Sequence, residues 1–267
     1  AVGGGGGGFD APSVTLPSAG VHTTWNMGAN LNTDRLKNVS SSVSARYTED
    51  YVDYHKRSDR TTFQGMTEDL RDMTDLQTDG TSRNLSLGAE FSRLNGTRSS
   101  FSFRPSIKYS RVSSNSGSEA TSSIGEALQN SSSSLNGAFC QTLSTSGNLT
   151  ASINGKNNSR RRLVGGLGYG FSKGDGDGFD KRNVLFGDGT EEVQSVTYDT
   201  DNDYYSLNPS LMYVEPLTES WLLQLTAASN ISSNKSIKDA RNEDNTVNEL
   251  FSSRTANSHV SNSLRAM

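Results

Sequence analysis

Apolar and polar residues alternate along about nine segments of this chain, and this period of two constrains the fold more than any other feature. In the segment 101–109 the odd positions are Phe, Phe, Pro, Ile and Tyr, whereas the even positions are Ser, Arg, Ser and Lys. Successive side chains of a strand point to opposite faces, so the alternation predicts half-buried strands. The predicted strands lie near residues 21–31, 39–47, 84–91, 101–109, 148–154, 163–171, 205–213, 221–228 and 259–266.

The composition narrows the class of β-protein. Only 31% of the residues are hydrophobic, against about 45–50% in an ordinary globular domain. This excludes a helical protein or an α/β enzyme with apolar parallel strands, and leaves a disordered chain, a secreted β-sandwich or solenoid, or a barrel with a polar lumen. Disorder does not preserve the alternation, and the outer face of a sandwich usually carries many charges. The polar positions here are mainly Ser, Asn, Thr and Gly, which favours a barrel.

Short and long connections alternate between the predicted strands. The short ones lie near residues 32–35, 95–97, 156–159 and 215–218, and the long ones near 50–80, 113–144, 174–203 and 234–253. Transmembrane barrels have this parity because their periplasmic turns are tight and their outer loops are free to grow. The sequence therefore predicts an all-β antiparallel transmembrane β-barrel.

The strand count and the parity also predict a domain organisation. A closed bacterial barrel has an even number of strands, so about nine strands predict the N-terminal part of a larger barrel. The expected partner is the missing remainder of that barrel. We expect residues 1–19 to form a Gly-rich outer loop and residues 20–267 to form an incomplete transmembrane barrel with four long outer loops.

Aromatic residues lie near the ends of the apolar faces. Girdles of aromatic side chains mark both lipid interfaces of outer-membrane barrels. We therefore expect contact with membrane lipid, and the predicted interface aromatics are Trp25, Tyr47, Tyr109, Tyr169, Phe171, Tyr213 and Trp221.

Three segments carry a family resemblance: residues 19–26, which follow a glycine-rich stretch, residues 101–107 and residues 211–217. With them, nearly the whole chain resembles the outer-membrane β-barrel family of Bacteroidota that is related to TonB-dependent receptors. The resemblance implies a bacterial outer-membrane location and uptake of a nutrient or other large substrate. It also implies a plug domain and a surface lipoprotein as partners. Family members carry a β-sandwich and a plug before the barrel, and this sequence contains neither.

Few residues suggest chemistry. Asp175, Asp177 and Asp180 alternate with glycines as in a calcium loop, since carboxylates suit this hard cation, but the bidentate Glu of such a loop is missing and a solvated loop explains them better. No other cofactor is expected. Cys140 is the single cysteine, and no Ser, His and Asp set converges, so we do not expect an enzyme. The basic run 160–162 is expected to face head groups or solvent, because the net charge of -4 argues against nucleic acid.

These observations favour a receptor-like importer in the outer membrane. The alternative of a different class is a structural or adhesin-like surface β-protein without transport activity. A barrel enzyme ranks third, because nothing in the sequence favours catalysis.

Overall fold

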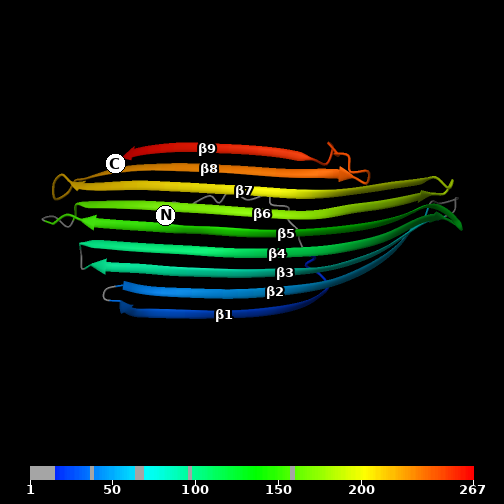
Figure 1. Cartoon of the computed structure of the whole chain (residues 1–267), viewed down its shortest axis with the longest axis horizontal. Helices are drawn as coiled ribbons and strands as arrows, with labels where there is room; N and C mark the ends of the chain where they lie inside the picture. Colours follow the sequence, from blue (N-terminus) through cyan, green and yellow to red (C-terminus); the bar gives the residue numbers. More distant parts are fainter. Residues whose placement is uncertain (1–15, 37–38, 64–68, 96–97, 157–159) are drawn as a thin grey trace.

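The described part of the chain forms one open antiparallel sheet. The computed structural model describes residues 16–36, 39–63, 69–95, 98–156 and 160–267, and their strands lie side by side in chain order (Figure 1). Each strand pairs with its sequence neighbours, so β1 and β9 are the two edges. The strands are β1 (Val21–Leu36), β2 (Val39–Thr62), β3 (Leu70–Asn95), β4 (Ser99–Ile124), β5 (Ala127–Asn154), β6 (Arg162–Phe186), β7 (Glu191–Pro216), β8 (Leu222–Asn242) and β9 (Ser253–Ala266).

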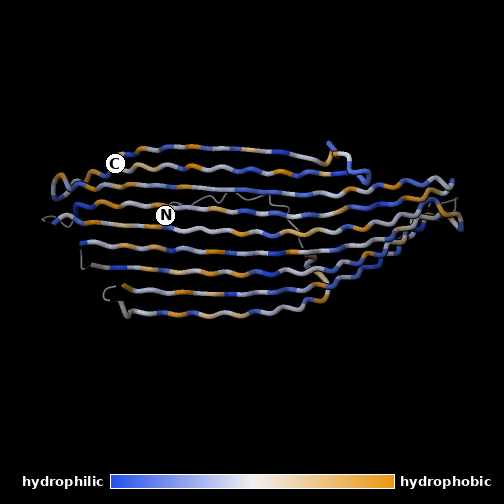
Figure 2. Tube along the Cα trace, in the orientation of Figure 1, coloured by the Kyte–Doolittle hydropathy of each residue, from blue (hydrophilic) through white to orange (hydrophobic). Residues whose placement is uncertain are grey.

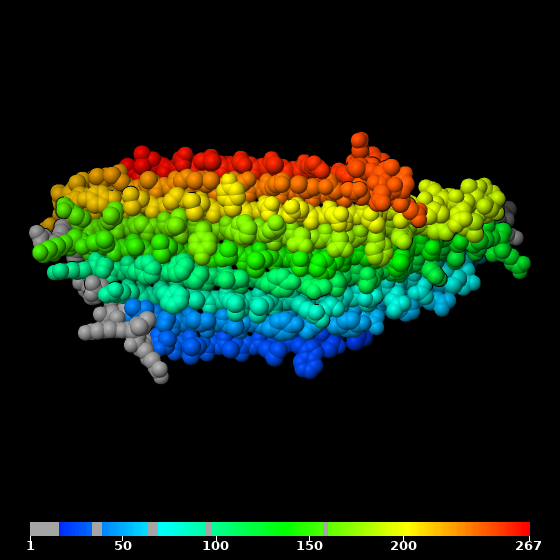
Figure 3. Space-filling view, viewed as in Figure 1, coloured from blue at the N-terminus to red at the C-terminus, as the bar shows by residue number. Residues whose placement is uncertain are grey.

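The all-β antiparallel prediction is confirmed, and the open sheet is consistent with part of a barrel. The described residues include no helix, and so none that could cross a bilayer. Figure 3 shows the strands as one continuous wall from the blue edge to the red edge. Most of residues 1–19, which were expected to form an outer loop, lie outside the described part of the chain.

Most residues of the four segments expected to be long outer loops are paired strand in the structure. Strands β2 to β7 are 24 to 28 residues long. The segment 113–144 is strand except for a turn at Gly125 and Glu126, and the segment 174–203 is strand except for residues 187–190. Pairing also runs through residues 50–62 and 70–80, and in the segment 234–253 it continues to Asn242.

The physical reason is that polar composition predicts exposure to water but does not prevent pairing. Every backbone N–H and C=O needs a partner, and an existing antiparallel ladder offers one at each further residue. Small hydroxyl side chains also pair across the strands, as in Thr78 with Ser116 at 2.9 Å and Ser118 with Ser134 at 2.8 Å. The Ser-rich segments therefore extend the hairpins.

The sheet has two ends. The near end holds the connections β1–β2, β3–β4, β5–β6 and β7–β8, and the far end holds the other four. At the far end Gly125 has a φ of 59° and starts a two-residue turn, a position that favours glycine. In the next far-end turn the backbone N–H of Thr190 donates to Asp188 at 2.9 Å and holds the pKa of that carboxyl below its usual value.

Apart from irregularities after Thr33 on β1 and after Ser122 on β4, the register divides the side chains between two faces of the sheet. The "band face" carries the odd-numbered residues of β1 to β8 and the even-numbered residues of β9; the "polar face" carries the others. Directly opposite residues share a face, as Ala29, Ala45 and Leu87 do. In Figure 2 short orange segments alternate with blue and white ones along parts of the strands, most clearly toward the near end at the left.

The small core lies on the polar face near the far end. Val52 and Ala240 are 0% exposed there, and Val196 and Cys140 are also buried. Leu16 packs over Gly80 on the same face, where an added Cβ would clash with the leucine. Burial on one face with exposure on the other indicates that the polar face is the concave side of the curved sheet.

Candidate functional site

The band face exposes apolar side chains on every strand. Trp25 is 65% exposed, Ile107 is 47% exposed and Leu211 is 51% exposed, and no described segment covers them. Soluble monomers rarely expose an apolar patch of more than a few hundred Å². We call this surface the apolar band; it comprises Trp25–Leu31, Val43–Tyr47, Leu85–Phe91, Phe101–Tyr109, Leu143–Ile153, Leu163–Phe171, Tyr205–Tyr213, Leu223–Ile231 and Val260–Ala266, taken at the band-face positions.

Both edges of the apolar band slope across the sheet in the same direction. The far edge begins at Trp25 on β1 and reaches Ile231 on β8. Through the register Ile231 is level with Leu31, which is six residues beyond Trp25. The near edge descends likewise, from Phe91 on β3 to Tyr213 on β7. The band is five residues long on β2 and eleven on β5, and its position shifts toward the near end between β1 and β8.

This slope has the geometry of tilted strands crossing an apolar layer. A shift of six residues at roughly 3.3 Å each, over seven strand spacings of roughly 4.8 Å, corresponds to a tilt of roughly 30°. Strands of transmembrane barrels tilt by about 35–45°. The band on β4, from Phe101 to Tyr109, is about 26 Å long and about 23 Å tall at that tilt, close to the apolar belt of about 25 Å in such barrels.

Six of the seven aromatic residues singled out from the sequence lie on the band face. Trp25, Tyr47, Tyr109 and Phe171 are at the far edge of the band, Tyr213 is at the near edge, and Tyr169 lies one position inside. Trp221 is in the β7–β8 turn and is 71% exposed. Their contact with a lipid interface stays a prediction.

A tyrosine, a glutamate and an arginine form a cluster at the far edge of the band. The Tyr47 hydroxyl donates to Glu49 Oε2 at 2.9 Å, and Arg83 Nε donates to Glu49 Oε1 at 2.7 Å. Glu49 lies two residues beyond Tyr47, and Arg83 is directly opposite it on β3. The charged pair thus lies just outside the apolar band, and the tyrosine ring lies inside it.

The near edge carries the same cluster in mirror orientation. Tyr213 and Arg161 both donate to the Glu215 carboxylate, and Glu215 again lies two residues outside the tyrosine. Arg160 donates to the backbone carbonyl of Glu219 at 2.7 Å, so two of the three consecutive arginines are engaged in contacts with the protein. Sequence reasoning missed both clusters, although the spacing Tyr-x-Glu occurs in each.

The Glu49–Arg83 ion pair on the band face should contribute more to stability than an ion pair on the polar face, and this difference can be tested. Replacing Glu49 by Gln leaves the Arg83 charge unpaired at the edge of the band, where a low dielectric makes it costly. We expect a lower urea concentration at the unfolding midpoint, measured by the tryptophan fluorescence of protein folded in lipid vesicles. The matched control is Glu90→Gln, because Glu90 pairs with Arg104 at 2.7 Å on the polar face. An equal effect of both substitutions would contradict a difference in environment.

Small hydroxyl and amide side chains cover the polar face over the same part of the sheet. They bond to one another across strands, as in Ser106 with Ser146 at 2.9 Å and Ser110 with Asn84 at 2.7 Å. Strand β6 contributes a glycine stripe on this face, which consists of Gly166, Gly168, Gly170, Gly174, Gly176 and Gly178. Side chains of neighbouring strands fill the space over it; for example, the Tyr198 ring lies over Gly178.

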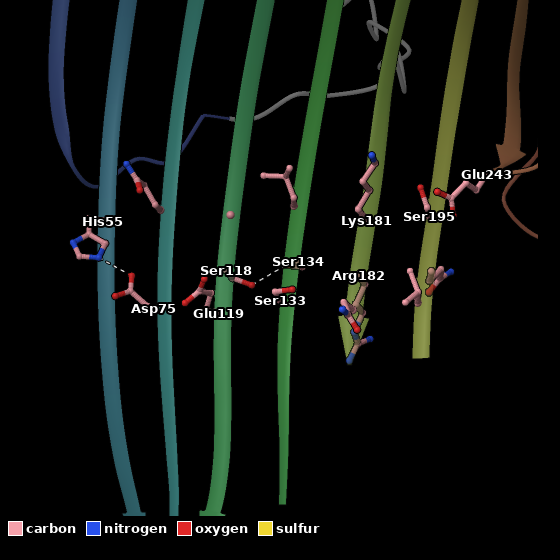
Figure 4. A pocket seen from close by; sticks show the side chains of 16 residues that line it. His55, Asp75, Ser118, Glu119, Ser133, Ser134, Lys181, Arg182, Ser195 and Glu243 are labelled. Carbon is pink, nitrogen blue, oxygen red and sulfur yellow. Dashed lines mark hydrogen bonds and ion pairs between the residues drawn. The ribbon is translucent and has the colours of Figure 1, made fainter. Parts of the chain in front are cut away.

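A shallow polar cavity of about 640 Å³ crosses the hairpins near the far end (Figure 4). On one side of it His55 and Asp75 are 2.6 Å apart, and Lys181, Arg182 and Glu243 lie toward the other side. Most of its lining residues belong to the band face, beyond the far edge of the apolar band. It contains charges of both signs but no nucleophile paired with a base, so its arrangement suits contact with a polar ligand better than catalysis.

The structure does not bring the three candidate calcium ligands together. They lie in the extended strand β6, where Asp175 and Asp177 are on the band face and Asp180 is on the polar face. Asp175 accepts a hydrogen bond from Gln141 at 2.8 Å. Among the described residues no group of three or more His, Cys, Asp or Glu side chains is arranged to hold a metal ion. The alternation of glycine and aspartate is that of a strand with a glycine face, and the loop interpretation overlooked this.

Comparison of the chain with models of protein families finds no match, and comparison with curated proteins finds no similar sequence. The resemblance to the Bacteroidota outer-membrane family therefore stays a prediction, and the function has to be inferred from the geometry.

Proposed function

We propose that this chain is part of the wall of a transmembrane β-barrel in a bacterial outer membrane. The observation that carries the proposal is the apolar band, which crosses every strand and has sloping edges with aromatic side chains at both of them. On this view the band face meets lipid and the polar face lines a water-filled lumen. The open edges β1 and β9 then pair with further strands of the same barrel, because a closed barrel leaves no unpaired edge.

The test of this proposal uses two adjacent residues on opposite faces of β4. Cys140 is first replaced by serine, and a new cysteine is placed at Ser106 or at Ile107. In protein inserted into vesicles, a membrane-impermeant maleimide should label the cysteine at 106 and not the one at 107. Dissolving the bilayer in denaturant should make both reactive.

Equal labelling of both positions in intact vesicles would contradict a lipid-facing band. Recovery of the chain as a folded, water-soluble monomer would also contradict the proposal, because the exposed apolar band needs an apolar environment.

For the barrel we propose uptake of a nutrient or other large substrate, in the manner of a TonB-dependent receptor. The small neutral side chains of the polar face support this role, since they leave a lumen open and wet. The far-end hairpins extend beyond the apolar band and provide the surface that a substrate would meet first. Deletion of the protein should abolish uptake of its substrate, and disabling the inner-membrane energy supply should have the same effect. Unchanged uptake across a broad panel of nutrients would favour a structural or adhesin-like role.

A further inference from the structure

Arg111 carries an uncompensated positive charge at the far edge of the apolar band. It lies on the band face of β4, directly opposite Arg83 on β3, and its side chain is exposed. Arg83 is paired with Glu49, whereas the Arg111 guanidinium has no carboxylate partner among the described residues. A charge left unpaired beside an apolar surface suggests an anionic ligand.

The Arg111 side chain is held in place without using up its hydrogen-bond donors. Its guanidinium carbon is 4.8 Å from the centroid of the Phe139 ring, which belongs to β5. Stacking on an aromatic ring orients the guanidinium plane and leaves its N–H groups free. Ser113 lies next on the same face of β4, about 7 Å farther along the strand, and adds a hydroxyl group to this part of the surface. This combination suits the oxygens of a phosphate group.

The apolar band continues directly from this place. Tyr109 lies two residues before Arg111 on the same face, level with Leu85 on β3 and Leu143 on β5. Acyl chains lying on these side chains would bring a lipid phosphate to the level of Arg111, because one position along a face is roughly 7 Å. The apolar and cationic surfaces are thus arranged like the two parts of a lipid molecule.

On strands β6 and β7, the band-face residues at the level of Arg111 are acidic. Through the register Arg111 is level with Asp175 on β6 and Asp201 on β7, and Asp177 and Asp199 follow one position beyond. These carboxylates repel a phosphate. An anionic head group is therefore directed to the β3–β4 part of the far edge.

We propose that Arg111, stacked on Phe139 and flanked by Arg83, docks the phosphate group of an anionic lipid of the surrounding bilayer. This inference rests on the proposed membrane location of the apolar band. It adds a specific lipid site to a wall that would otherwise meet all lipids alike.

The test measures lipid preference with the full chain in phosphatidylcholine vesicles. Spin-labelled phosphatidic acid and spin-labelled phosphatidylcholine are compared by the fraction of each that the protein immobilises. The Arg111→Ala variant should lower the preference for phosphatidic acid about tenfold, the factor that one hydrogen bond to a charged group supplies. The Arg111→Lys variant keeps the charge without the planar fork and should lose less. Arg104→Ala is the matched control, because Arg104 lies on the polar face and pairs with Glu90.

Three results would overturn the site. The first is an unchanged preference in Arg111→Ala while the chain is inserted, which leaves the barrel proposal standing. The second is displacement of the phosphatidic acid by millimolar inorganic phosphate, which would assign the site to a free anion. The third is recovery of the chain as a folded, water-soluble monomer that does not enter vesicles, which would overturn this inference together with the barrel proposal.

Discussion

Replacing Leu167 by arginine should destabilise the protein in a bilayer by about 2–4 kcal/mol, the cost of a cationic side chain at the lipid-facing midplane of a barrel. Leu167 lies halfway between Leu163 and Phe171, the two ends of the apolar band on β6. The expected measurement is the free energy of unfolding from urea titration of protein folded in vesicles, followed by tryptophan fluorescence.

The matched control for this prediction is Asn208→Arg. Asn208 is exposed on the polar face of β7, next to Pro209, the residue directly opposite Leu167. An arginine at this position points into the proposed lumen, where water and hydroxyl groups solvate it, so we expect little change. If Leu167→Arg is as well tolerated as Asn208→Arg, the band does not face lipid.

Replacing Gly176 by valine should destabilise the sheet by about 1–3 kcal/mol, the usual cost of overpacking a close contact. A Cβ on Gly176 would clash with the backbone carbonyl of Phe139 and would lie 3.1 Å from Thr200 Oγ1. A backbone atom cannot move aside as a flexible side chain can. The β5–β6–β7 packing must therefore shift, and the urea midpoint of the vesicle-folded protein should fall.

Gly165→Val on the same strand is the control for Gly176→Val. An added Cβ on Gly165 meets no atom within 4 Å, and the residue belongs to the band face. Valine at this position adds apolar surface to a face that we propose to contact lipid. The stability of the vesicle-folded protein should therefore be unchanged or slightly higher. The reverse order of the two effects would show that the polar face of β6 is not the crowded, concave one.

Much of the fold follows from residues that are neighbours in sequence. The alternation in Phe101–Tyr109 predicted a strand with one apolar face, and the short connection near residues 95–97 predicted a hairpin; the structure has both. The segment 113–144 was misjudged because serine-rich composition was taken as a loop signal. Its two-residue turn begins at Gly125, and the residues 113–123 before the turn are mostly serine and other small polar residues, with no apolar alternation to mark a strand.

The candidate sites also combine features that can be deduced from the sequence with features that depend on strand pairing. The spacing of Tyr47 and Glu49 places both on one face of a strand, and this can be deduced from the sequence. That Arg83, 34 residues later, completes the cluster depends on the register between β2 and β3. The Arg111 contact with Phe139 depends in the same way on the register between β4 and β5, and the sloping edges of the band depend on the register of all the strands.

The sequence by itself determined that this chain forms about nine antiparallel strands with an apolar and a polar face, because side-chain direction repeats every two residues. Only the tertiary structure decided how far the strands extend, which residues stand level with one another and which face is concave. Those properties depend on hydrogen bonds between residues distant in sequence, and a shift of register by one residue would place each side chain of a strand on the opposite face.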